Sequence, residues 1–143
     1  MTVLPIGKNI FEVGAVHADR ELFDSLMPTP HGTTYNAYLV VGSEKTALID
    51  AVDPLKTRVL LKNLSEAGVE RIDYLITLHT EQDHSGSNDA VLKRYPMAQV
   101  VGNKTVRDML ETHLHFDASR VKVVEEGDQI DLGDKKLTFL MIP

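Results

Sequence analysis

The sequence predicts an α/β fold: a single domain over residues 1–143 in which strands and helices alternate around a mixed sheet. Its length of 143 residues is enough for one domain with a hydrophobic core. Apolar residues make up 43% and charged residues 25%, as in ordinary globular proteins. Hairpin signals at both ends flank a strand–helix–strand–helix–strand run, and this order predicts mixed pairing.

The first third of the chain reads as strands joined by a loop and a turn. Residues 10–16 form a short apolar stretch, and residues 18–31, punctuated by Pro28, Pro30 and Gly32, indicate a loop. The strands expected here, 34–41 and 46–50, enclose the turn 42–45 and predict a hairpin.

The middle of the chain alternates helical and strand signals. Asp53-Pro54 opens a helix in which apolar residues recur at helical spacing, and Gly68 ends it. The dense apolar segment 72–78 predicts a strand buried on both faces. The remaining expected elements are a helix over 88–95, a strand over 98–102, a helix over 105–113 capped by Asn103, and strands over 121–124, 129–132 and 136–142.

Charge and composition exclude several partners. The net charge is −6 and no basic run offsets it, which argues against nucleic acid or an anionic membrane surface. There is no Cys, so a disulfide framework and a thiolate site are excluded. With neither a signal-peptide pattern nor an apolar run of membrane-spanning length, we expect a cytoplasmic protein.

The segment after the buried strand carries the strongest chemical signal. His79, Glu81, Asp83 and His84 place four potential metal ligands within six residues. In an extended stretch the first three would point to one side, and a turn at Asp83-His84 would bring His84 to the same pocket. Two carboxylates beside two imidazoles are costly without a cation, so we expect a metal site. The alternative is a solvated polar loop.

The ligand types narrow the choice of metal. Two nitrogens and two carboxylates suit iron, manganese or zinc, but not copper(I) or an iron–sulfur cluster. Bridging carboxylates and added negative charge favour a redox-active metal pair.

Residues 79–84 resemble the metal motif of the metallo-β-lactamase superfamily, with Glu81 where a second His usually stands. This variant is similar to the flavodiiron proteins, also called A-type flavoproteins. Residues 31–40, which include Gly-Thr-Thr-Tyr-Asn, and residues 47–50 and 127–143 also resemble that family. The resemblance implies a metallo-β-lactamase-like αββα sandwich, of which this chain supplies the N-terminal half.

The resemblance also implies roles for individual residues. His79 and Glu81 match ligands of one iron, and Asp83 matches a ligand of the other. His84 matches a residue that ligates the second iron in some members and turns away in others. The family reduces oxygen to water or nitric oxide to nitrous oxide, with electrons from a donor such as a rubredoxin or a flavoprotein reductase.

The sequence also departs from the family pattern. It has no Trp, and residues 15–30 differ from the matching family segment. The family's later His, bridging Asp and final His, and the flavodoxin-like domain that binds flavin mononucleotide (FMN), are absent from these residues. We therefore expect that this chain alone turns over neither gas at a useful rate.

Two other functions stay open. One is a zinc-dependent hydrolase of the same fold, against which Glu81 argues because such hydrolases usually keep His there. The other is a non-catalytic half-domain. The strands at 38–40, 48–49 and 74–78 would leave an apolar face bare, so we expect a homodimer or a second polypeptide that completes the fold.

Other candidate residues receive structural interpretations. His113 and His115 lie at the expected end of a helix, where a cationic imidazole favours the helix dipole. His17 and His31 are expected in loops. Tyr35 is expected in the core, because a strand tyrosine is more often buried than part of a site.

Overall fold

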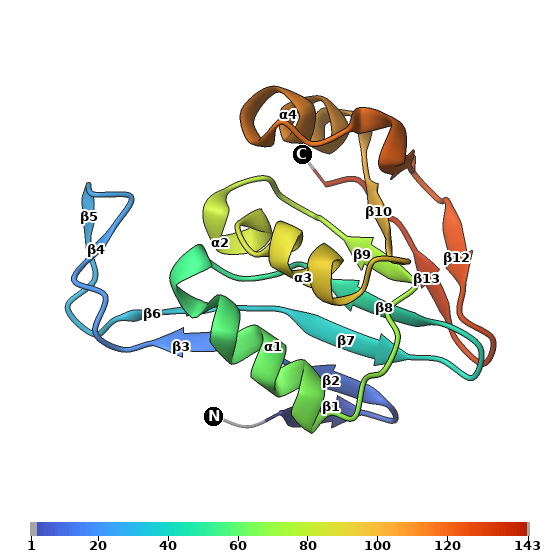
Figure 1. Cartoon of the computed structure of the whole chain (residues 1–143), viewed down its shortest axis with the longest axis horizontal. Coiled ribbons are helices and arrows are strands. Elements are labelled where there is room, and N and C mark those ends of the chain that lie inside the picture. The colour runs from blue at the N-terminus through green and yellow to red at the C-terminus, as the bar shows by residue number, and fades with distance from the viewer. Residues whose placement is uncertain (1–2, 143) are drawn as a thin grey trace.

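The computed structural model describes residues 3–142, apart from the side chains of residues 113 and 114. Seven strands form one mixed sheet in the order β1-β2-β7-β8-β9-β10-β11 (Figure 1). The first four of these pair antiparallel, and β8 to β11 run parallel. Their bounds are β1 Leu4–Gly7, β2 Ile10–Glu12, β7 Tyr38–Val41, β8 Thr46–Ile49, β9 Tyr74–Ile76, β10 Gln99–Gly102 and β11 Val121–Val123.

Three two-stranded pairs extend this sheet or pack against it. An arm projects from the body in Figure 1, with β4 paired to β5 at its outer end and β3 paired to β6 at its base. The third pair is the β12–β13 hairpin. The bounds are β3 Ala15–His17, β4 Leu22–Phe23, β5 Met27–Pro28, β6 Thr33–Tyr35, β12 Gln129–Asp131 and β13 Lys136–Thr138.

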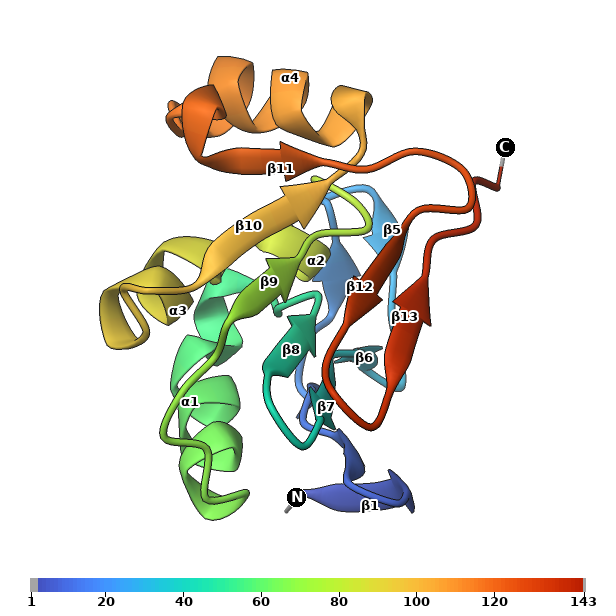
Figure 2. The ribbon, with the colours of Figure 1, turned by 90° about the vertical axis from the view of Figure 1, so that its right-hand side faces the viewer.

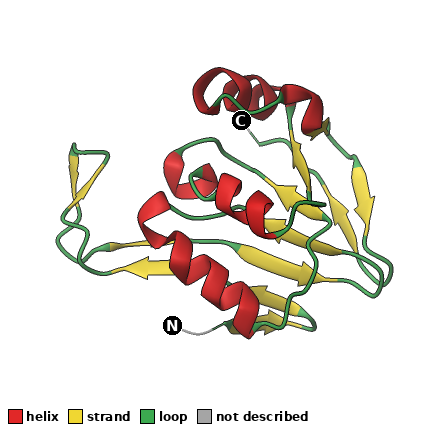
Figure 3. Cartoon of the chain, in the orientation of Figure 1, coloured by secondary structure: helices red, strands yellow, loops and turns green. Residues whose placement is uncertain are grey.

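Helices α1 and α3 cover one face of the main sheet (Figure 3). Leu60 and Leu64 of α1 pack with Leu39, Leu48 and Leu75 of the strands, and all five side chains are fully buried. The helices are η1 Pro54–Lys56, α1 Thr57–Glu66, α2 Gln82–Ser85, α3 Asn88–Arg94, α4 Lys104–Leu114 and η2 Ala118–Arg120.

The other face of the sheet is partly covered by the β12–β13 hairpin (Figure 2). Val40 and Ile76 of the sheet are buried there, in one cluster with Ile130 and Leu132. The hairpin therefore covers part of the apolar face that the sequence predicts to be exposed. Leu78, with 60% of its surface exposed, remains open beyond the hairpin.

Two expected strands are each divided in the structure. The strand expected at 10–16 separates into β2 and β3, because Gly14 lies against the carbonyl of Tyr35, where an added Cβ would come within 2.0 Å of the oxygen. The strand expected at 34–41 separates into β6 and β7. The expected loop at 18–31 contains the β4–β5 pair, and β1 was not predicted.

Most local signals in the middle of the chain are confirmed. Asn103 accepts a hydrogen bond from the Val106 amide and caps α4. Asp53 caps η1, and Gly68 follows α1 with a φ of +70°. Among the described helices, none combines the length and apolar character needed to cross a membrane.

Candidate metal centre

The parallel pairing of β8 and β9 brings two polar segments to one edge of the sheet. Ile49 lies opposite Ile76, so the chain leaves both strands at the same level. Asp50 turns there with a φ of +57°, a conformation that Asp adopts more readily than most residues. Its amide donates to the Ile76 carbonyl at 2.7 Å, and its Oδ1 accepts from the Leu78 amide at 2.7 Å. Asp50 therefore fixes the path of the chain into His79.

The segment after His79 is helical rather than extended. Glu81 precedes α2 in an extended conformation, and Asp83 and His84 lie in its single turn. The expectation that alternation in an extended stretch aligns His79, Glu81 and Asp83 is therefore wrong, because the chain begins to coil at Gln82. The turn is fixed from outside, since the Ala51 amide donates to the His84 carbonyl at 2.7 Å.

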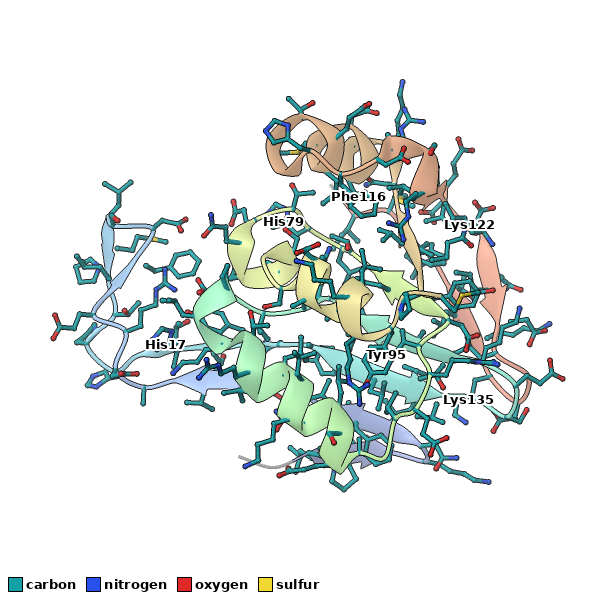
Figure 4. All side chains as sticks on the ribbon, viewed as in Figure 1. His17, His79, Tyr95, Phe116, Lys122 and Lys135 are labelled. Atoms are coloured by element: carbon teal, nitrogen blue, oxygen red, sulfur yellow. The ribbon has the colours of Figure 1, made fainter. Side chains whose placement is uncertain are left out.

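The four predicted ligands lie in two pairs. His79 Nε2 is 3.5 Å from Glu81 Oε1, and His84 Nε2 is 3.4 Å from Asp83 Oδ2. The two imidazole rings face each other edge to face, with centroids 5.3 Å apart. His79 lies on the loop that leads into α2 (Figure 4). Among the side chains that the structure describes, no three His, Asp or Glu residues converge closely enough to hold a metal ion as they stand.

One carboxylate oxygen of this group is buried without a partner. Asp83 Oδ1 has no hydrogen bond, and among the described side chains only Asn88 Oδ1 shares that condition. Removing a carboxylate oxygen from water without compensation is costly, and most buried polar atoms are paired. A cation beside Asp83 would remove this cost, so the donor set fits a hard or borderline divalent metal.

Asp50 also contacts His84, and the sequence analysis did not single it out. Its Oδ2 lies 2.8 Å from His84 Nδ1. Burial raises the pKa of Asp50, while the hydrogen bonds from the Leu78 amide and from His84 act in the opposite direction. A carboxylate acceptor at Nδ1 holds the ring proton there, which leaves the Nε2 lone pair free. The position of Asp50 directly after β8 was the sequence signal that could have identified it.

A second polar cluster lies next to the first. Arg20 Nη1 is 2.6 Å from Asp53 Oδ2 and 2.7 Å from the Tyr35 hydroxyl, which is 2.9 Å from His17 Nδ1. Asp53, Tyr35 and His17 are all buried. The expectation that His17 lies in a loop is wrong, because it ends β3, whereas Tyr35 lies in the core as expected. Sequence analysis predicted no role in a site for Arg20, and it singled out Asp53 only as the start of a helix.

The Tyr35 hydroxyl bonds both Arg20 and His17. Arginine only donates, so the Tyr35 oxygen accepts from Arg20, and the same hydroxyl shares a second hydrogen bond with His17 Nδ1. Burial raises the pKa of Tyr35, whereas the hydrogen bond from Arg20 acts in the opposite direction.

The other histidines stay apart from this edge. His115 ends α4 in a left-handed conformation, with a φ of +52°, and is exposed. The side chain of His113 lies outside the described residues. His31 lies in the turn before β6 and is exposed.

Comparisons with known proteins agree with this geometry. Residues 32–143 match the Metallo-beta-lactamase superfamily. The chain is 36% identical over 140 residues to a nitric oxide reductase of Moorella thermoacetica, covering 96% of this chain and 35% of that protein. It is 35% identical over 145 residues to a flavo-diiron protein of Clostridium acetobutylicum, covering 100% of this chain and 36% of that protein.

Solved structures show the same similarity. Rubredoxin oxygen:oxidoreductase from Desulfovibrio gigas superposes with a TM-score of 0.89 at 32% identity, over 97% of this chain and 35% of that one. The chain thus spans about a third of the length of the relatives it matches. The expected resemblance to flavodiiron proteins is confirmed, and the chain belongs to the metallo-β-lactamase superfamily.

Proposed function

We propose that this chain supplies part of the di-iron site of an oxygen or nitric oxide reductase, with His79, Glu81, Asp83 and His84 as metal ligands. The observation that carries the proposal is the unpartnered, buried Asp83 Oδ1, on a carboxylate whose Oδ2 lies 3.4 Å from His84 Nε2. The flavodiiron relatives support iron as the metal, with zinc as a possible substitute during purification.

The four proposed ligands differ in how firmly the fold holds them. Asp83 and His84 are held by the turn of α2, and Asp50 orients the His84 ring. His79 and Glu81 have 54% and 58% of their side-chain surfaces exposed, which leaves their donor atoms free to turn toward a cation. A bound iron pair would supply the electrons and an open coordination position for the diatomic substrate.

The wider reaction rests on the same proposal. We infer electron delivery through FMN from a rubredoxin or a flavoprotein reductase, because the matched relatives include a flavo-diiron protein and a rubredoxin oxygen:oxidoreductase. We place the reaction in the cytoplasm, as the sequence led us to expect. The flavin domain lies outside these residues, so we expect this chain by itself to show negligible gas consumption.

Metal binding tests the proposal directly. The purified chain is loaded anaerobically with ferrous iron, and affinity is measured by competition with a chelator of known strength. We expect His79→Ala, Glu81→Gln and Asp83→Asn each to weaken iron binding at least about tenfold, because the first removes the imidazole donor and the other two replace a charged carboxylate by a neutral amide. His31→Ala, in an exposed turn, is the control and should leave affinity unchanged.

A second experiment tests the zinc-hydrolase alternative. Glu81→His restores the ligand pattern usual in hydrolases of this superfamily, and it should shift preference toward zinc relative to the unaltered chain. If all three ligand variants bind iron with the same affinity as the unaltered chain, the proposal is overturned. Ester or lactone hydrolysis by the zinc-loaded, unaltered chain would favour the hydrolase instead.

A further inference from the structure

We propose that Arg20 is a positioning residue for α2, acting through Asp53 and the loop that joins β8 to α1. The inference rests on the proposed function, because α2 carries two of the four proposed ligands. It assigns a role at the metal centre to a residue from the projecting arm, far from the motif in sequence.

The first step is the contact between the arm and the loop. Arg20 Nη1 lies 2.6 Å from Asp53 Oδ2, and their side chains are only 16% and 6% exposed. A hydrogen-bonded ion pair that is largely shielded from water is stronger than an exposed one, and losing one partner leaves a buried charge. Arg20 also donates from Nε to the Leu22 carbonyl, which fixes the guanidinium to the arm.

The second step runs from Asp53 into the loop. Asp53 Oδ1 accepts from the Leu55 amide and so begins η1, while Oδ2 faces Arg20. The two oxygens therefore hold the loop and the arm in one arrangement. Thr57, at the end of η1, donates to the Pro54 carbonyl at 2.8 Å and shares a 2.7 Å hydrogen bond with the Ser87 hydroxyl.

The third step is the close packing of this loop on α2. An added Cβ at Gly86 would come within 2.5 Å of Pro54 Cδ, so the Pro54 ring packs directly against the Gly86 backbone. Ser87, which is buried, also reaches the Asp53 carbonyl at 3.5 Å. Together with the bond from the Ala51 amide to the His84 carbonyl, these contacts hold the C-terminal end of the turn that bears Asp83 and His84. A shift of Asp53 would therefore be passed to α2.

A set of matched variants tests whether Arg20 acts along this route. Manganese(II) serves as the probe, because its binding is measured by electron paramagnetic resonance without turnover. Hydrogen exchange of the Ser85 and Gly86 amides, which close the α2 turn, is measured on the metal-free chain. Both measurements are made well below the melting temperature of each variant.

We expect Arg20→Gln and Asp53→Asn each to weaken manganese binding roughly tenfold and to speed exchange of both amides. The double variant should match either single variant, because both substitutions break the same connection. Arg20→Lys should recover part of the affinity. Tyr35→Phe removes the other partner of Arg20 and should leave both measurements close to those of the unaltered chain.

Arg107→Gln is the control, since the Arg107 guanidinium bonds the neighbouring Asp108 on α4. Unchanged exchange in Arg20→Gln, or additive losses in the double variant, would overturn the inference. If the unaltered chain binds no metal, the proposed function fails. The exchange measurement then still decides whether Arg20 positions α2.

Discussion

Asp50 and His84 are joined by a 2.8 Å hydrogen bond between Oδ2 and the ring Nδ1, across 34 residues of sequence. Asp50 ends one strand and His84 lies on α2, so the bond forms only when β8 and β9 are correctly paired. This bond orients the imidazole ring so that Nε2 faces Asp83.

Asp50→Asn should weaken metal binding about 10- to 100-fold, the range typical when an orienting partner of a ligand is lost. The amide places a donor group against His84 Nδ1, which favours the tautomer protonated at Nε2, and Asn tolerates the positive φ. Chelator competition measures affinity, and ¹⁵N chemical shifts report the tautomer. Asp89→Asn, at an exposed site paired with Lys93, makes the same change in charge and should have no effect.

Gly86→Ala should destabilise the fold by about 1–3 kcal/mol, the cost typical of overpacking. The new methyl group would meet both the Gln82 carbonyl and Pro54 at 2.5 Å. Urea unfolding measures the change. Gly7→Ala is the matched control, because its nearest neighbour lies at an ordinary 3.4 Å, and equal losses in the two variants would contradict the close approach.

Leu60→Ala should lower the free energy of unfolding by about 2–5 kcal/mol, because Leu60 is fully buried between α1 and the sheet. Leu55→Ala provides the comparison, since Leu55 is 75% exposed and its truncation should cost less than about 0.5 kcal/mol. A small effect at Leu60 would mean that α1 does not pack on this sheet.

Stability should fall as the pH rises above about 10, the ordinary tyrosine pKa. Burial raises the pKa of Tyr95, whose hydroxyl donates to the Val69 carbonyl at 3.1 Å. The folded protein thus holds this proton more tightly than the unfolded chain. The stabilisation is complete below the unfolded pKa and is lost as the pH rises through the folded one. Tyr95→Phe should flatten this decline, because it removes the titrating hydroxyl.

The chain should associate in solution through the apolar surface beyond the β12–β13 hairpin. Leu140 and Ile142, which are 70% and 88% exposed, line a cavity of about 250 Å³ together with Leu78. Light scattering on the Leu140→Ser/Ile142→Ser variant should show a smaller particle than the unaltered chain. Met97→Ser, equally exposed but in the turn before β10, should not change the size. A monomer of the unaltered chain at micromolar concentration would contradict the prediction.

Local sequence signals predicted much of the fold. Asp53-Pro54, Gly68 and Asn103 mark helix ends through hydrogen bonds and backbone conformations that lie within a few residues. The division of residues 10–16 into β2 and β3 was not predictable, because it depends on how close Gly14 approaches Tyr35, 21 residues away.

For the site, the sequence by itself predicted four candidate donor residues and determined their place after a buried strand, because residue type and short spacing are local properties. Only the tertiary structure decided that Asp50 orients His84, that Arg20 pairs with Asp53, and that the donors lie in two pairs. Those contacts cross 33 or 34 residues of sequence or follow from the helical turn at Gln82. The reason is physical: strand pairing and packing bring such atoms together, and neither leaves a repeating pattern along the chain.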